Sequence, residues 1–386
     1  MTPRCTCSVT AALTTLPGAP FTLARLTLDG PRDDEVLVRI VACGICQTDL
    51  AVRDSPALMP KPAVLGHEGA GIVEAIGERV TRVRPGDAVV ISFSSCGRCS
   101  ACLRGEPAYC AHTRSLNFGG GRPDGSTALH EAPAAAEPRP VRSHFFGQSS
   151  FATRAVVNER NLVRVTEAVD AGVALETLGP MGCGLQTGAG GVLNSLKVRP
   201  GSRLAIYGTG AVGLAATMAG AIAGAATVLA VDVQPQRLAL ARELGATHVV
   251  DARDPEADAQ IEAALGGADG GGADFALDTS GRLDTLRGAV QRLAPRGVLG
   301  LISSAKGADV PVNALHLMVG GRGVVGIHQG DSVPQVFIPQ LIAWHRAGRF
   351  PFERLLGFYD LARINDAADD LAQGRVIKPV VRMPAA

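Results

Sequence analysis

The chain has 386 residues, which is enough for two domains with separate cores and removes the need for disulfide bonds to stabilise a small fold. Hydrophobic residues make up 46% and charged residues 19%, so a disordered or collagen-like chain is excluded. A net charge of +1 and an aromatic content of 4% argue against a nucleic-acid-binding or membrane-surface protein.

The N-terminal residues 1–20 make a poor signal peptide, because Arg4 is the only early cation and Pro17 and Gly18 interrupt the apolar run. We therefore expect a cytoplasmic chain, in which cysteines serve as metal ligands more often than in disulfides, and the spacing of the nine cysteines must show which of them do so. We expect Cys5 and Cys7 in a frayed terminus and assign them no role.

The first third of the chain is expected to consist mainly of β-strands, separated by turns that contain glycine and proline. The predicted strand segments are 13–28, 35–41, 71–76 and 87–92. A stretch rich in glycine, proline and alanine predicts a long surface loop over 117–142, and strand structure is expected to resume at 151–157.

Three short motifs in or next to this part contain residues that commonly bind metals. Cys43 and Cys46 form a C-x-x-C pair, His67 stands between Gly66 and Glu68, and Cys183 lies in a G-C-G sequence. A thioredoxin-like redox pair is an alternative for the two cysteines, but its βαβ context is missing. Taken alone, His67 is compatible with a structural histidine, and sequence spacing does not join the three regions.

Four further cysteines follow the pattern C-x2-C-x2-C-x7-C, at Cys96, Cys99, Cys102 and Cys110. Such spacing lets one loop wrap a tetrahedral thiolate site, which is closed and therefore structural. An iron–sulfur cluster is the main alternative, but the bacterial ferredoxin pattern ends in x3-C-P, whereas Ala111 follows here. We therefore predict zinc, with Arg98 and Arg104 offsetting the thiolate charge.

Beyond residue 184, strands alternate with helices, which predicts a doubly wound parallel sheet. The expected strands are 203–207, 227–231, 247–250, 275–278 and 297–302, and the expected helices are 211–223, 235–244, 256–265 and 283–293. The uncharged stretch 211–231 is long enough to span a membrane, but its alanine and glycine content favours a buried helix and strand. Helices at 334–347 and 364–373 and a strand at 376–381 end the chain.

A glycine-rich turn joins the first strand and the first helix of this alternating part. Gly208 permits a tight turn, Gly210 permits a pyrophosphate to approach the backbone, and Gly213 permits close helix packing. Asp232 ends the next strand, where a carboxylate accepts hydrogen bonds from a ribose 2′-hydroxyl and repels a 2′-phosphate. The pattern favours NAD over NADP, and the alternative is an ordinary glycine-rich βα turn.

These motifs occur in the order found in zinc-dependent medium-chain alcohol dehydrogenases, which the chain resembles over nearly its whole length. The motifs are Cys46-Gln47-Thr48-Asp49, residues 66–71, the four-cysteine lobe, Gly182-Cys183-Gly184 and residues 208–213. Within that family the stretches 50–54, 144–152 and 184–190 resemble the aryl-alcohol (benzyl-alcohol) dehydrogenase branch.

The resemblance implies an α/β architecture with a GroES-like β-rich catalytic domain over residues 1–183 and 335–386. A Rossmann NAD-binding domain over residues 184–334 would be inserted between these two segments. It also implies a homodimer or homotetramer, because β-rich segments within 297–330 pair across a two-fold axis in this family.

The resemblance further implies two zinc ions per chain, one in the four-cysteine lobe and one held by Cys46, His67 and Cys183. The catalytic zinc would act as a Lewis acid, and Thr48 would hydrogen-bond the alcohol oxygen and relay its proton. Asp49 and Glu68 occupy positions that orient the ligands, with structural hydrogen bonding as the alternative for Asp49. Cys43 is expected to be a packing residue.

Three cofactor contacts follow from the same resemblance. Arg237 is placed for the adenosine ribose, with a solvated helix charge as the alternative, and Lys378 for the pyrophosphate. Gln47 stands where many members have a basic residue, so one contact between charges is expected to be lost. Ala51 replaces a histidine that passes the proton to solvent in several members, so the proton route beyond Thr48 is undefined.

We therefore expect an NAD-dependent zinc oxidoreductase that interconverts a primary alcohol and its aldehyde, with an aromatic or allylic alcohol as the expected substrate. An aliphatic alcohol or the formaldehyde–glutathione adduct is the alternative substrate within the family. A zinc-ribbon protein without catalysis is the alternative from a different class, and near-zero net charge argues against its binding nucleic acid.

Overall fold

The computed structural model describes residues 6–131, 139–266, 271–303, 307–310 and 312–384, and the chain folds into two units. The first unit comprises Met1–Cys183, Val333–Ile342 and Glu353–Ala386, and the second comprises Gly184–Ser332 and Ala343–Phe352. The first unit is thus discontinuous in sequence, because the chain returns to it near its C-terminus.

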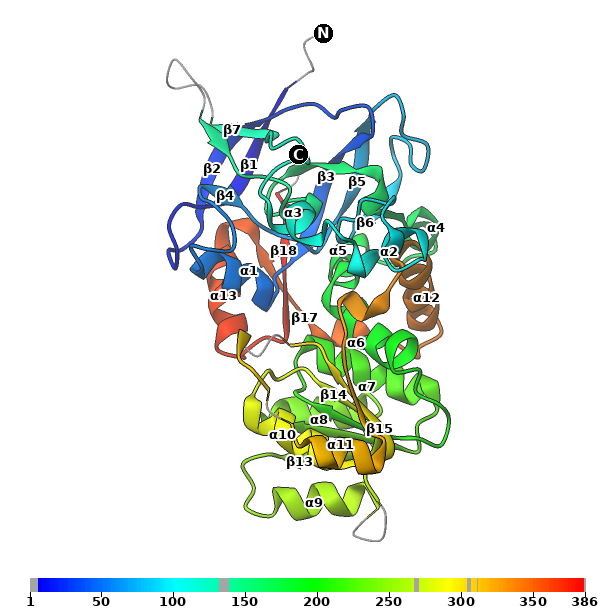
Figure 1. Ribbon diagram of the computed structural model, residues 1–386. Coiled ribbons are helices and arrows are strands. Elements are labelled where there is room, and N and C mark those ends of the chain that lie inside the picture. Colours follow the sequence, from blue (N-terminus) through cyan, green and yellow to red (C-terminus); the bar gives the residue numbers. More distant parts are fainter. Residues whose placement is uncertain (1–5, 132–138, 267–270, 304–306, 311, 385–386) are drawn as a thin grey trace. The chain divides into compact units, whose positions relative to one another are not determined.

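Two β-sheets form the framework of the first unit (Figure 1). One sheet has the order β4-β1-β2-β7-β8, with β1 (Cys7–Thr14), β2 (Thr22–Leu28), β4 (Ala63–Val64), β7 (Leu129–Glu131) and β8 (Pro140–Val141). The other sheet has the order β10-β6-β5-β3-β18-β17, and β9 also pairs with β3. Its strands are β3 (Glu35–Gly44), β5 (Gly69–Ile76), β6 (Ala88–Ile91), β9 (Arg154–Asn158), β10 (Leu162–Arg164), β17 (Leu356–Asp360) and β18 (Lys378–Arg382).

The pairing of β3 with β18 joins the two ends of the chain. In Figure 1 the red strand β18 lies beside the blue strand β3, and Val380 pairs with Gly44 in antiparallel register. Along β3, Val36, Val38 and Ile40 alternate with partly exposed residues and enter the core, as a period of two residues requires. This pairing places the start of β18 next to the segment that precedes Cys46.

In its described residues the first unit also contains the short α-helices α1 (Gln47–Asp54), α2 (Ser100–Leu103), α3 (Thr113–Phe118), α4 (Thr166–Asp170), α5 (Leu175–Leu178) and α13 (Ile364–Ala372). The helix α12 (Pro334–Arg346) begins in this unit and ends in the other. Sequence analysis predicted α12 and α13 but not α1, whose apolar residues are too few to show a helical period.

Two expectations for the first unit are wrong. Cys7 does not lie in a frayed terminus, because it is the first residue of β1 and pairs with Leu28, while Cys5 lies outside the described residues. The predicted surface loop 117–142 contains β7, β8 and a buried arginine, Arg122. The guanidinium of Arg122 donates to both carboxylate oxygens of Glu35, at 2.6 and 3.0 Å, and this partner lies too far away in sequence for composition to reveal it.

The second unit is built on a six-stranded parallel sheet with the order β13-β12-β11-β14-β15-β16. Its strands are β11 (Arg203–Tyr207), β12 (Thr227–Asp232), β13 (His248–Asp251), β14 (Ala273–Asp278), β15 (Leu293–Leu301) and β16 (Gly323–Gly326). Numbered along the chain, this order is 3-2-1-4-5-6, the order of a Rossmann sheet. The expected doubly wound class is thereby confirmed.

Helices of the second unit pack against this sheet (Figure 1). They are α7 (Ala211–Ala223), α8 (Pro235–Glu243), α9 (Ala257–Ala264), α10 (Leu283–Gln291) and α11 (Ala314–Gly320), and α6 (Gly184–Gly190) opens the unit. The bounds of β11 and α7 match the sequence prediction. Alternation was easy to recognise here because the buried parallel strands are short, continuous apolar runs.

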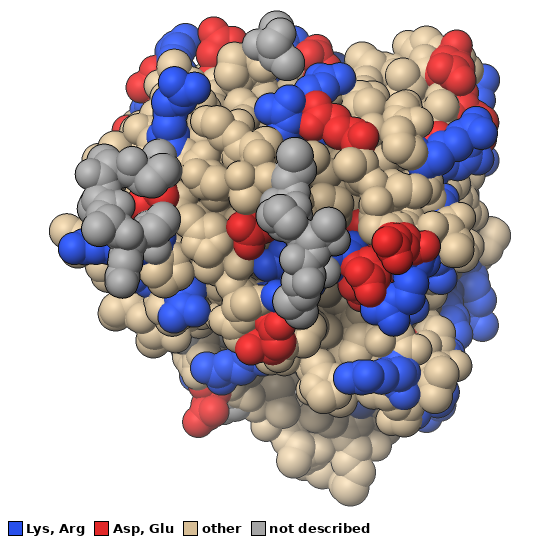
Figure 2. Space-filling view, turned by 90° about the horizontal axis from the view of Figure 1, so that it is seen from above, with Lys and Arg blue, Asp and Glu red and all other residues tan. Residues whose placement is uncertain are grey.

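The apolar stretch 211–231 forms α7 and then β12, as predicted, and not one continuous helix. Gly224 ends α7 with φ +75°, a conformation that glycine adopts without strain. In the described parts of the chain, no helix has both the length and the apolar character needed to cross a membrane. Figure 2 shows Lys and Arg side chains interspersed with Asp and Glu over the viewed face.

Candidate active site

Asp49 joins two of the three segments that were predicted to supply metal ligands. Its Oδ2 accepts a hydrogen bond from the backbone N–H of Cys46 at 2.9 Å, at the start of α1. Its Oδ1 accepts from the N–H of Gly66 at 3.1 Å and lies 3.0 Å from Nδ1 of His67. A buried carboxylate at Nδ1 selects the tautomer that leaves Nε2 free to bind a metal. Asp49 therefore orients His67.

The structure brings Cys46, His67, Glu68 and Cys183 together, with one candidate ligand atom of each within 4.8 Å of the others. Nε2 of His67 is buried and, among the described residues, has no hydrogen-bond partner. A hydrogen bond from the Cys183 thiol holds the pKa of Cys46 well below its usual range. Two sulfurs and one imidazole nitrogen form a donor set that zinc prefers at catalytic sites, so these residues fit the metal.

Glycines allow the Cys183 segment to approach this cluster closely. A Cβ on Gly182 would meet the carbonyl oxygen of Ile91 at 2.2 Å, and one on Gly179 would meet that of Glu68 at 2.3 Å. The hydroxyl of Ser92 donates to the carbonyl of Gly182 at 2.7 Å. Gly179 and Gly182 are thus required before Cys183 because backbone packs on backbone here.

Glu68 forms a buried ion pair with Lys378. The ammonium lies 2.9 Å from both carboxylate oxygens and 3.2 Å from the carbonyl oxygen of Ile45, and Lys378 is 2% exposed. Burial lowers the pKa of Lys378, but the Glu68 carboxylate raises it more, so the ammonium remains protonated. A contact between Lys378 and a cofactor phosphate would require this pair to open, and that role stays a prediction.

The other predicted residues of this region lie on α1. The hydroxyl of Thr48 is 3.8 Å from the sulfur of Cys46, whereas Gln47 and Ala51 are exposed. Cys43 is fully buried among apolar side chains, and burial raises the pKa of its thiol. The helix thus places Thr48 beside the candidate metal site and Gln47 toward solvent.

Sequence analysis did not identify Gln148 as a residue of this site. Its side chain reaches the backbone on both sides of Glu68, where it donates to the carbonyl of His67 at 2.9 Å and accepts from the N–H of Gly69 at 3.1 Å. A single glutamine in a polar loop carries no local signal of such a contact, which depends on how distant segments pack.

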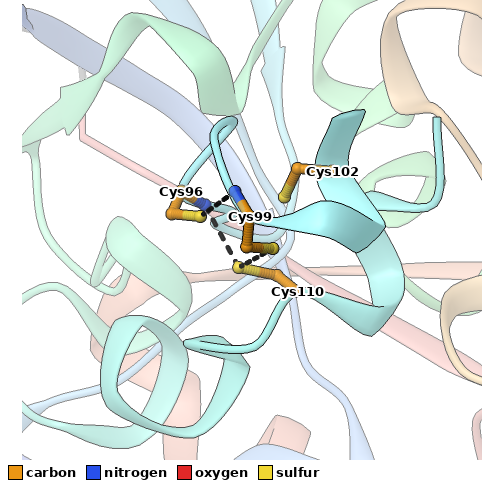
Figure 3. Close-up of side chains that lie close together, drawn as sticks. All are labelled: Cys96, Cys99, Cys102 and Cys110. Carbon is orange, nitrogen blue, oxygen red and sulfur yellow. Dashed lines mark hydrogen bonds between the residues drawn. The ribbon is translucent and has the colours of Figure 1, made fainter. Parts of the chain in front are cut away.

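The four-cysteine lobe forms a second cluster, in which the four sulfurs lie within 4.8 Å of one another (Figure 3). Backbone N–H groups of Cys96, Cys99, Ala111 and His112 donate to these sulfurs at 3.3 to 3.4 Å. N–H groups of Cys102 and Ala111 lower the pKa of Cys99 to about 6, which favours the thiolate. Four converging sulfurs fit a closed tetrahedral zinc site.

A further arginine lies beside this lobe. Arg104 pairs with Glu106 at 2.8 Å, and the predicted charge compensation by Arg98 and Arg104 stays a prediction. The guanidinium of Arg160 lies against Gly97, where a Cβ would meet its Cζ at 2.2 Å. Gly97 has φ +70°, so glycine here serves both the turn and the close approach of the arginine.

The glycine turn in the second unit has the geometry of a phosphate-binding loop. Gly208 has φ +93°, and a Cβ on Gly213 would meet the carbonyl oxygen of Gly208 at 1.8 Å. A Cβ on Gly210 would meet nothing within 4 Å, so the surface at the N-terminus of α7 is open. Backbone N–H groups at such a helix start stabilise phosphate oxygens.

Asp232 is held rigidly next to this turn. Its Oδ2 accepts from the backbone N–H and the hydroxyl of Thr209, at 2.5 and 2.8 Å, and its Oδ1 accepts from the N–H groups of Val233 and Gln234. Arg237, in the first turn of α8, is partly buried.

Comparison with known protein families matches both parts of the chain. The alcohol dehydrogenase GroES-like domain matches residues 32–167, and the zinc-binding dehydrogenase domain matches residues 211–345. Geraniol dehydrogenase from Castellaniella defragrans is 44% identical over 376 residues, covering 97% of each chain.

Two solved structures are similar over nearly the whole chain. An alcohol dehydrogenase zinc-binding domain protein from Burkholderia ambifaria is 47% identical, with a TM-score of 0.94 over 99% of this chain and 100% of that one. Benzyl alcohol dehydrogenase from Acinetobacter calcoaceticus is 42% identical, with a TM-score of 0.91 over 98% of this chain and 100% of that one.

Proposed function

The chain belongs to the zinc-dependent medium-chain alcohol dehydrogenases, and we propose that it oxidises primary aromatic or allylic alcohols to aldehydes with NAD as the hydride acceptor. The observation that carries this proposal is the convergence of the half-buried Cys46 with the buried His67 and Cys183, in which Nε2 of His67 has no hydrogen-bond partner among the described residues. Relatives named geraniol dehydrogenase and benzyl alcohol dehydrogenase support the substrate class.

Within this proposal the first unit supplies the metal ligands and Thr48, the residue that relays the proton of the alcohol. Cys46, His67 and Cys183 would hold the catalytic zinc, which supplies Lewis-acid polarisation of the alcohol oxygen. Thr48, whose hydroxyl lies 3.8 Å from the Cys46 sulfur, would accept a hydrogen bond from the alcohol and relay its proton by giving up its own, and Asp49 would keep the His67 imidazole oriented. The Lys378 ammonium balances the Glu68 carboxylate, so that no unpaired negative charge lies beside the two thiolates.

The second unit would bind the cofactor. Gly208, Gly210 and Gly213 shape the turn for the pyrophosphate, and Asp232 would accept hydrogen bonds from the ribose hydroxyls. Arg237 is proposed to contact the adenosine ribose from the first turn of α8. Because the Asp232 side chain is fixed next to this turn, NADP would bring its 2′-phosphate against a negatively charged residue, so NAD is favoured.

Gln47 is expected to affect the rate at which NADH dissociates. It is exposed at the start of α1, where we propose that it faces the pyrophosphate without the charge of an arginine. The substitution Gln47→Arg should then tighten NADH binding, measured by fluorescence titration. Equal dissociation constants for the variant and the parent protein would contradict this placement.

Turnover with four substrates separates the proposed function from its alternatives. Benzyl alcohol and geraniol should give the highest kcat/KM, ethanol a much lower one, and the formaldehyde–glutathione adduct the lowest. Conjugation stabilises the aldehyde product of the first two. Preference for ethanol or the adduct would assign the chain to another branch of the family, and absence of turnover with all four would leave the zinc-ribbon alternative.

The structure also supports the proposal that the chain forms a homodimer or homotetramer. Strand β16 ends the six-stranded sheet, and α11 next to it exposes Leu315, Met318 and Val319 by 63%, 73% and 76%. Exposed apolar residues beside an open strand edge favour association with a second copy. Light scattering should show the oligomer dissociating in Met318→Lys.

We also propose a cytoplasmic location, since the described cysteines form no disulfides.

A further inference from the structure

Residues 144–149, which we call the strap, adopt an unusual backbone conformation next to the candidate metal site. His144, Phe146 and Ser149 have φ values of +58°, +51° and +58°, and Gly147 has φ +67°. Residues other than glycine rarely adopt this left-handed backbone conformation. Backbone strain of this kind is found mainly at functional sites. The strap must therefore be held by contacts that compensate for its conformation.

Buried contacts hold the strap at both ends. The hydroxyl of Ser149 donates to the carbonyl of Val64 at 2.6 Å and accepts from the N–H of Phe145 at 2.9 Å. At Gly147 a Cβ would meet the side-chain nitrogen Nδ2 of Asn161 at 2.3 Å, so only glycine permits this packing. These contacts fix where the strap directs Phe146 and Gln148.

Both of those side chains meet His67. The ring of Phe146 stacks on the imidazole, with centroids 4.5 Å apart and planes at 28°. Gln148 is 2% exposed, and its Nε2 donates to the carbonyl oxygen of His67 at 2.9 Å. Its Oε1 accepts from the N–H of Gly69 at 3.1 Å and from the hydroxyl of Ser150 at 2.7 Å.

We propose that Gln148 is a positioning residue for the catalytic zinc site, which sets the His67 ligand before the metal binds. Asp49 holds Nδ1 of the imidazole, Phe146 covers one ring face, and Gln148 holds the backbone from which the side chain projects. Together they direct Nε2 toward the two cysteine sulfurs. This inference rests on the proposed zinc site and adds a residue that touches neither metal nor substrate.

The rate of zinc release tests this role without any measurement of turnover. A chromophoric chelator should remove zinc from the parent protein in two phases, one for each site. In Gln148→Ala the phase of the catalytic site should become at least about tenfold faster, as is usual when a partner behind a metal ligand is lost. The phase of the four-cysteine lobe should not change, so it serves as an internal reference.

A matched control separates positioning from general loss of packing. Gln186→Ala removes another fully buried glutamine, in the second unit, and should leave both release phases unchanged. If the alanine variant fails to fold, Gln148→Met can replace it, because methionine keeps the side-chain volume. This variant should accelerate zinc release from the catalytic site alone. With cobalt in the catalytic site, the visible absorption band should shift in Gln148→Met but not in Gln186→Ala.

Three results would overturn the inference: release that is unchanged in both Gln148 variants, release that accelerates equally at both sites, or equal acceleration in Gln186→Ala. Each of these leaves the proposed function intact. The proposed function itself fails if the parent protein carries one zinc per chain that survives Cys46→Ala, because the site next to His67 then holds no metal.

Discussion

Breaking the buried ion pair between Arg122 and Glu35 should destabilise the first unit strongly. The side chains of the pair are 3% and 8% exposed, and two hydrogen bonds join them. Burial alone would raise the pKa of Glu35, but His144, whose Nε2 lies 3.8 Å from the carboxylate, and the hydrogen-bonded Arg122 guanidinium lower it from 4.5 to about 2. A shift of this size corresponds to about 3 kcal/mol of stability.

The substitution Arg122→Met removes the cation and keeps most of the side-chain volume. Because Glu35 then stays buried without its partner, the free energy of unfolding at pH 7 should fall by about 3 kcal/mol. Since the pKa of Glu35 is depressed in the folded protein, this stabilisation is present above pH 4.5 and is lost as the pH falls toward 2. The difference between variant and parent should therefore shrink below pH 4.5.

Urea unfolding monitored by circular dichroism measures the effect, with Arg282→Met as the matched control. Arg282 forms the same kind of pair with Asp284, but the two side chains are 69% and 66% exposed. Exposed pairs contribute little, so this control should cost less than about 1 kcal/mol. An equal loss of unfolding free energy in the two variants would refute the reasoning. A difference between Arg122→Met and the parent protein that does not depend on pH would refute it as well.

Three further predictions follow from the two metal clusters and the cofactor turn. Cys99→Ser should lower the zinc content, measured by elemental analysis, from two ions per chain to one, and two retained ions would contradict the assignment of the lobe. Asp232→Gly should raise kcat/KM with NADP relative to NAD by about tenfold or more, since the carboxylate that repels the 2′-phosphate is removed; an unchanged ratio argues against Asp232 as the selecting group. Gly213→Val should destabilise the second unit by about 3 kcal/mol or more in calorimetry, because its Cβ would lie 1.8 Å from the carbonyl oxygen of Gly208, and an unchanged transition would contradict this clash.

Local patterns were sufficient where the chemistry lies within a short stretch of chain. The four cysteines from Cys96 to Cys110 lie in one short segment of the chain, so their spacing alone predicted a cluster. The glycine turn and α7 were predicted with the correct bounds because the turn, the helix and the apolar strand before it are adjacent in sequence. The resemblance to a family then grouped Cys46, His67 and Cys183, which spacing by itself did not.

Contacts between distant segments were decided only by the tertiary structure. Gln148 holds the His67 backbone across 81 positions in sequence, and Lys378 pairs with Glu68 across 310. Neither residue carries a local signal of its partner. For Lys378 the partner is selected by strand order, because β18 pairs with β3 and so places Lys378 at the candidate metal site. The sequence thus determined which groups can bind zinc and a nucleotide, while long-range packing determined which side chains orient and balance them. A buried polar group must find a partner wherever the fold provides one.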